Sequence, residues 1–163
     1  MKYLSKSSEK TKKIGENLAK QILKKPKTKA GAFVILLSGD LGGGKTTFVQ
    51  GFAAGLGVKE KILSPTFVIC KKFQIPNPKA QASPKSQKIK AKMRYKNFYH
   101  IDCYRAGNSR DMGALGMGEI ISNPENIVVV EWPEKAEGVD FSNAAKINFS
   151  FAGENIREIF IGR

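Results

Sequence analysis

A glycine-rich stretch between two apolar segments constrains this chain more tightly than any other feature of its sequence. Residues 39–46 read Gly-Asp-Leu-Gly-Gly-Gly-Lys-Thr and match the pattern G-x-x-x-x-G-K-T. The preceding run 33–37 is continuously apolar, as in a strand that is buried on both faces of a parallel sheet. After the loop, Phe48, Phe52 and Leu56 recur at helical spacing. A strand, a glycine-rich loop and a helix in this order predict a phosphate-binding loop.

This loop predicts which groups hold a nucleoside triphosphate. Glycines reach positive φ without a Cβ clash, so successive backbone N–H groups can line one concavity, and the following helix adds its positive N-terminal end. Lys45 is expected to reach the outer phosphates, and Thr46 is expected to bind Mg²⁺, which prefers hard oxygen ligands. The loop residues predicted to contact the nucleotide are Asp40, Leu41, Gly42, Gly43, Gly44, Lys45 and Thr46.

Two acidic residues are candidates to complete this site. Glu131 follows the apolar run 127–130, and in open α/β sheets ligands lie beyond the carboxyl ends of the strands. Glu131 is therefore predicted to hold Mg²⁺ or its water; the alternative is a surface glutamate that closes a strand. Asp102 lies in a second strand-like segment, 95–104, where an acid is costly unless it has a partner. It either orients the attacking water or accepts its proton, or it pairs with Arg105 or another basic group.

Two further side chains, Thr66 and Trp132, leave a functional and a structural interpretation open. Thr66, after Pro65, either senses the γ-phosphate as switch segments do, or lies in a proline-fixed turn that enters a strand. Trp132 either packs near the nucleotide or belongs to the core. His100 is interpreted as a structural histidine. By strand alternation, one face is expected to carry Phe98, His100, Asp102 and Tyr104.

The net charge of +14 is concentrated in two regions. Residues 1–29 contain ten lysines and two glutamates, and residues 71–96 contain eight lysines and one arginine with no acid. The segment 71–96 is expected to be a flexible basic insertion, because it has few apolar residues to bury. Such regions can bind phosphate backbones, which suggests a tRNA contact. The alternative is a solvated surface in a lysine-rich protein, since 23 of the 28 basic residues are lysine.

Length and composition limit the number of domains, the cellular location and the kinds of metal or disulfide site that the chain can have. A chain of 163 residues suits one domain, here 1–163, and its longest apolar run, 30–37, is far shorter than the roughly 20 residues of a membrane span. No apolar stretch follows the basic N-terminus as a secretory signal requires, so a cytoplasmic protein is expected. Its two cysteines are predicted to be free thiols, with a single disulfide as the alternative. One histidine and two separated cysteines argue against a zinc site.

The remaining elements complete the expected fold. An amphipathic helix is predicted over 11–25, ended by Pro26, and a glycine-weakened helix over 111–121. Segments 145–151 and 156–161 flank a turn and predict a hairpin. The predicted fold class is α/β, with one P-loop NTPase-like domain whose mainly parallel sheet is flanked by helices and ends in a C-terminal β-hairpin.

Four motifs in this order resemble the TsaE family, bacterial P-loop ATPases needed to make threonylcarbamoyladenosine (t6A) on tRNA. They are 39–47, Ser64-Pro65-Thr66-Phe67, His100-Ile101-Asp102-Cys103-Tyr104-Arg105 and Glu131-Trp132-Pro133-Glu134. The resemblance covers residues 11 to about 160. It implies a compact α/β domain and an ATPase that is slow alone and stimulated by its partner, a TsaB–TsaD complex. It implies ATP and Mg²⁺ roles for Lys45, Thr46 and Glu131, and functional importance for Thr47, Thr66, Asp102 and Trp132.

Two other functions fit the phosphate-binding loop. A P-loop small-molecule kinase would need a phosphoacceptor pocket and usually several arginines over the transferred group, yet the middle of the chain offers only Arg94, Arg105 and Arg110. A nucleotide-gated RNA-binding module would use the basic regions. A GTPase is disfavoured, because the sequence has no N-K-x-D segment for guanine.

Overall fold

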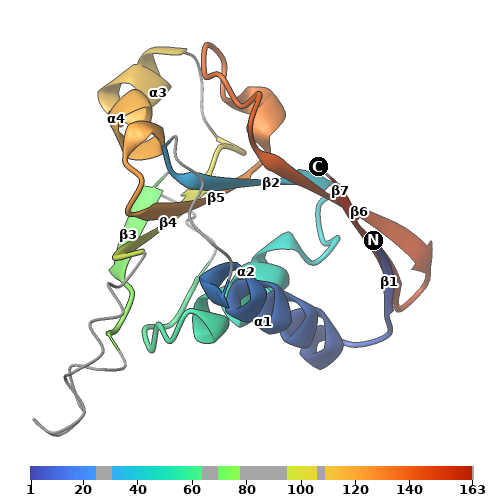
Figure 1. The fold of residues 1–163 in the computed structure, drawn as a ribbon. Helices are drawn as coiled ribbons and strands as arrows, with labels where there is room; N and C mark the ends of the chain where they lie inside the picture. The colour runs from blue at the N-terminus through green and yellow to red at the C-terminus, as the bar shows by residue number, and fades with distance from the viewer. Residues whose placement is uncertain (25–30, 64–69, 78–94, 106–108, 163) are drawn as a thin grey trace, which may run out of the picture.

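Seven strands form one mixed sheet in the order β1–β7–β6–β2–β5–β4–β3 (Figure 1). The computed structural model describes residues 1–24, 31–63, 70–77, 95–105 and 109–162. The strands are β1 (Lys2–Ser5), β2 (Phe33–Gly39), β3 (Cys70–Gln74), β4 (Asn97–Asp102), β5 (Asn126–Glu131), β6 (Ala145–Gly153) and β7 (Ile156–Gly162). Parallel pairings join β6, β2, β5 and β4, and antiparallel pairings add β3 at one edge and β7 and β1 at the other. The predicted α/β class and the C-terminal hairpin β6–β7 are confirmed.

Helices cover the two faces of the sheet differently (Figure 1). The longer helices, α1 (Ser8–Lys24) and α2 (Lys45–Gly55), pack on one face, and the short helices α3 (Ser109–Ala114) and α4 (Met117–Ser122) pack on the other. Side chains of β5 alternate between the two apolar cores, because successive residues of a strand point to opposite faces. All six residues of β5 are buried, as the apolar run predicted.

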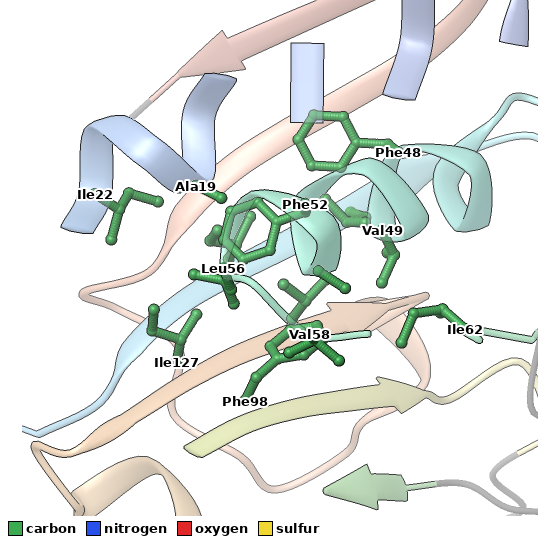
Figure 2. Close-up of a cluster of buried hydrophobic side chains, with 14 of the residues drawn as sticks. Ala19, Ile22, Phe48, Val49, Phe52, Leu56, Val58, Ile62, Phe98 and Ile127 are labelled. Atoms are coloured by element: carbon green, nitrogen blue, oxygen red, sulfur yellow. The ribbon is translucent and has the colours of Figure 1, made fainter. Parts of the chain in front are cut away.

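Glycines allow α1 and α2 to pack at very short range. A Cβ atom at Gly51 would lie 1.9 Å from the carbonyl oxygen of Lys12, and one at Gly15 would lie 2.4 Å from that of Phe48. Figure 2 shows Phe48 and Phe52 of α2 in the core between the helices and the sheet. Both rings are fully buried. The helix that follows the glycine-rich loop is therefore held between α1 and the sheet.

Two predicted helices differ in extent from those observed. The first begins at Ser8, three residues before the predicted start; its predicted end at 25–26 lies outside the described residues. The predicted helix over 111–121 is two helices, α3 and α4. Gly116 lies between them with φ of 65°, a left-handed conformation that cannot continue a right-handed helix.

The edge strands were the least predictable part of the sheet. β1 has four residues and was not predicted. β3 occupies the first part of 71–96, so that part of the expected insertion is a sheet edge; residues 78–94 lie outside the described ranges. In β3, Phe73 is buried and its neighbours Lys72 and Gln74 are exposed. This alternation covers too few residues to identify a strand from the sequence. Within the described ranges, no helix is long and apolar enough to cross a membrane.

Candidate nucleotide-binding site

The glycine-rich loop connects the carboxyl end of β2 to the first turn of α2. Gly39 closes β2 with φ of 126°, and a Cβ there would lie 2.1 Å from the carbonyl oxygen of Phe149 on β6. Gly44 precedes α2 with φ of 98° and provides no side-chain cap. Because helix geometry gives the first N–H groups no partner inside the helix, the N-terminus of α2 is available to an anion in the loop.

Lys45 is folded back onto this loop. Its side chain is buried, and its Nζ atom donates hydrogen bonds to the carbonyl oxygens of Gly39 and, at 2.8 Å, of Asp40. The same Nζ atom lies 3.9 Å from the centre of the Trp132 ring, within the range of a cation–π contact. Burial lowers the pKa of Lys45, and the nearby carboxylates, Glu131 foremost, oppose that shift. In this structure the ammonium group of Lys45 is thus held by two backbone carbonyl oxygens and the Trp132 ring.

Glu131 and Thr46, the two predicted metal ligands, lie in direct contact. The Thr46 hydroxyl is 3.2 Å from both carboxylate oxygens of Glu131, although the two residues are 85 positions apart. Glu131 is 1% exposed and ends β5, and Thr46 lies in the first turn of α2. A second contact comes from His100, whose Nε2 atom lies 2.8 Å from Oε1 of Glu131.

Asp102 lies beside Glu131 at the same edge of the sheet. It ends β4, and its Cα atom is paired with that of Glu131 in the parallel register. The residue is 9% exposed, and its Oδ1 atom accepts a hydrogen bond of 3.0 Å from the backbone N–H of Tyr104. The strand ends at Asp102, so Tyr104, which was predicted to continue the strand face, instead follows in a turn and packs its ring on Trp132.

Trp132 has an unusual backbone. Among the described residues it is the one non-glycine residue with positive φ, at 57°. Its backbone N–H donates to the carbonyl oxygen of Leu37 at 3.1 Å, and this turn directs the chain away from β5. Its ring contacts both the Lys45 ammonium group and the Tyr104 ring, whose centre is 5.0 Å away. Of the two interpretations of Trp132, the geometry therefore supports a position at the site as well as contact with the core on the α3–α4 side.

These residues enclose a cleft of about 210 Å³. Tyr104 and most of the predicted site residues line this cleft. The predicted residues that line it are Leu41, Gly42, Gly43, Gly44, Lys45, Thr46, Thr47, Asp102, Glu131 and Trp132. Thr66 lies outside the described residues. A second hollow, of about 320 Å³, shares Gly42, Gly44 and Thr47 with the first and extends to Thr11 and Arg157. Small-molecule pockets usually span about 300–1,000 Å³, so the first cleft is smaller than a typical pocket and the second hollow lies at the lower end of that range.

Sequence reasoning missed Tyr104, which lines the cleft. His100, interpreted as a structural histidine, is buried and does not line the cleft, but no pattern in the sequence indicated that its partner is Glu131. Strand alternation correctly placed His100 and Asp102 on one face. Alternation does not predict the register between β4 and β5, and it is this register that places His100 and Asp102 beside Glu131.

Comparison with known proteins identifies the family of this chain. The profile described as "Threonylcarbamoyl adenosine biosynthesis protein TsaE" matches residues 5–159. The chain belongs to the TsaE family. The resemblance inferred from the sequence motifs is thereby confirmed, and the family role is in t6A biosynthesis.

Individual TsaE proteins are moderately similar in sequence to this chain. The tRNA threonylcarbamoyladenosine biosynthesis protein TsaE of Bacillus subtilis is 33% identical over 77% of this chain and 66% of its own length, and that of Haemophilus influenzae is 28% identical over 78% and 67%. The Borreliella burgdorferi TsaE match, at 33% identity, spans 61% of that protein. The crystal structure of Bacillus subtilis YdiB superposes with a TM-score of 0.68 at 27% identity, covering 99% of this chain and 83% of that one.

Proposed function

We propose that this TsaE-family protein binds ATP with Mg²⁺ and hydrolyses it slowly, in support of t6A modification of tRNA. The contact between Thr46 and Glu131 is the observation that carries the proposal. It joins the hydroxyl that follows the loop lysine to a buried carboxylate at the carboxyl end of a neighbouring strand. A Gly-rich turn that merely connected a strand to a helix would have no need for this pairing.

The side chains at the site fit a magnesium ion. Mg²⁺ takes oxygen ligands and retains several waters, so one hydroxyl and one carboxylate, together with phosphate oxygens, satisfy it. No group of three or more His, Cys, Asp or Glu side chains converges in the described part of the chain, as a metal site formed by protein alone would require. Thr46 and Glu131 would hold the ion, which, when bound, neutralises charge on the outer phosphates.

The chain's own groups have separate roles in this proposal. Lys45 exchanges its two carbonyl partners for phosphate oxygens, and Trp132 limits where its ammonium group can move. Asp102 accepts a hydrogen bond from the attacking water or takes its proton, because its carboxylate lines the cleft. The second hollow would receive the nucleoside, since it adjoins the same glycines.

The proposal extends to partners through the family. The family role in t6A biosynthesis supports docking on a TsaB–TsaD complex that stimulates the ATPase, and a cytoplasmic location where tRNA is modified. Exposed lysines of α1, among them Lys10 and Lys24, favour a tRNA contact, although Glu16 pairs with two others, Lys13 and Lys20.

ATP hydrolysis by the purified protein tests this function. We expect ATP to bind in the presence of Mg²⁺, with slow turnover that rises when TsaB–TsaD is added. Asp102→Asn keeps the shape of the side chain and removes its charge, so turnover should fall about 100-fold or more while ATP affinity stays within about threefold. Failure of the unsubstituted protein to bind ATP would overturn the proposal, and normal turnover of the variant would remove Asp102 from the mechanism.

A further inference from the structure

His100 and Glu131 form a buried pair behind the cleft. Both side chains are almost fully buried, at 1% and 2% exposure, and Nε2 of His100 lies 2.8 Å from Oε1 of Glu131. A magnesium ligand must be an ionised carboxylate, which has no proton to donate, so in the metal-binding state Nε2 carries the hydrogen of this contact. A buried carboxylate is stable only when its oxygens have donors, and the imidazole supplies one of them.

The backbone fixes this pair before any ligand arrives. In the parallel register of β4 and β5, His100 is paired with Val129, so Glu131 lies one diagonal step further along the neighbouring strand on the same face. Both strands lie inside the sheet, and β5 is buried along its whole length. The imidazole therefore has little freedom to turn away from the carboxylate.

The second hydrogen-bond partner of Glu131, the Thr46 hydroxyl, must change its contact when a metal binds. Thr46 donates its hydroxyl hydrogen to the carboxylate in this structure, but the same oxygen is the proposed magnesium ligand. If Thr46 takes up that role, its hydrogen bond to Glu131 is altered, and His100 remains as a donor whose position does not depend on the ligand.

We propose that His100 is a positioning residue, which holds the Glu131 carboxylate in the orientation that the magnesium-bearing nucleotide requires. This inference rests on the proposed function. Groups that hydrogen-bond a metal-binding side chain orient it, and their removal typically weakens metal affinity about 10–100-fold. His100 does not line the cleft, so its effect should appear in the response to Mg²⁺ and leave metal-free nucleotide binding unchanged.

Calorimetric titration of ATP over a series of Mg²⁺ concentrations, and in EDTA, tests this role. His100→Phe keeps a ring of similar size and removes the donor, whereas His100→Gln restores an N–H at a comparable reach. We expect the Phe variant to need about 10–100-fold more Mg²⁺ to reach the affinity of the unsubstituted protein, with ATP affinity in EDTA unchanged within about twofold. The Gln variant should recover to within about threefold of the unsubstituted protein.

Asn97→Ala is the matched control. Its Nδ2 atom donates to Oδ1 of Asn126 at 2.9 Å, a hydrogen bond between the same two strands at the end far from the cleft. This variant should leave the Mg²⁺ response unchanged. A normal Mg²⁺ response in His100→Phe, or a Gln variant as impaired as the Phe variant, would overturn the inference. Absence of Mg²⁺-dependent ATP binding in the unsubstituted protein would overturn the proposed function and the inference with it.

Magnetic resonance of the unsubstituted protein gives a test that does not require any variant to fold. The chain has one histidine, so its imidazole signals need no assignment. We expect the Nε2-bound proton of His100 to be visible and hydrogen-bonded both without ligand and with Mg²⁺ and a non-hydrolysable ATP analogue. Loss of this proton signal in the liganded state would show that His100 does not hold Glu131 there and would overturn the inference.

Discussion

The two ends of the β4–β5 strand pair use polar side chains in opposite ways. At the carboxyl end, Glu131 and Asp102 place acidic groups beside each other at the cleft. At the amino end, Asn97 and Asn126 occupy equivalent positions in the same register but form a neutral amide pair. The neutral pair satisfies its own hydrogen bonds within the fold. The acidic end places like charges side by side, which costs stability unless a cation compensates, and in this structure the Lys45 ammonium group interacts with both carboxylates.

Lys45 gives the largest expected effect at the cleft end. Lys45→Met keeps the length of the side chain and removes its charge, so ATP affinity measured by calorimetry should fall about 100-fold, or about 2.8 kcal/mol. Because burial lowers the pKa of Lys45, the unsubstituted protein should also lose affinity as the pH rises toward the ordinary lysine value of 10.5, when the ammonium group gives up its proton. Unchanged ATP affinity in Lys45→Met would refute the assignment of the site.

Asn126 should give a smaller effect of a different kind. Its side chain is 2% exposed, accepts from Asn97 and donates to the carbonyl oxygen of Ile120 at 2.9 Å. Asn126→Leu leaves both partners unsatisfied, so the free energy of unfolding should fall by about 1–3 kcal/mol in urea titrations. ATP affinity should stay within about twofold. A large loss of ATP affinity without loss of stability would contradict the division between the two strand ends.

The exposed ion pair near the amino ends of β4 and β5 should give the smallest effect on stability. Lys96 Nζ lies 2.7 Å from Oε1 of Glu125, but the side chains are 56% and 39% exposed. Lys96→Ala should lower the free energy of unfolding by less than about 1 kcal/mol, because water and salt screen exposed pairs. The loss should shrink further at high salt in the same urea titrations. An effect comparable to that of Asn126→Leu would show that this end depends on charge after all.

The sequence predicted the central elements of the fold and most of the cleft. The glycine loop, the buried strand before it and the acid that ends β5 are local patterns with one dominant structural meaning, and the structure places them together. The short edge strand β1 has too few residues to show a period, and the break at Gly116 depends on one backbone angle. The contact of His100 with Glu131 depends on strand register, which no local pattern contains.

The contact between α1 and α2 has a consequence for how the protein can vary. Gly51 lies with its Cα against the backbone of Lys12, so even the methyl group of an alanine would wedge the two helices apart. Because α2 begins at the loop lysine, such a wedge would tilt the anion-binding end of that helix together with its body. The orientation of the glycine-rich loop and of the start of α2 thus depends on an interface one to two helical turns away, so substitutions at that interface should alter the proposed nucleotide site without touching it.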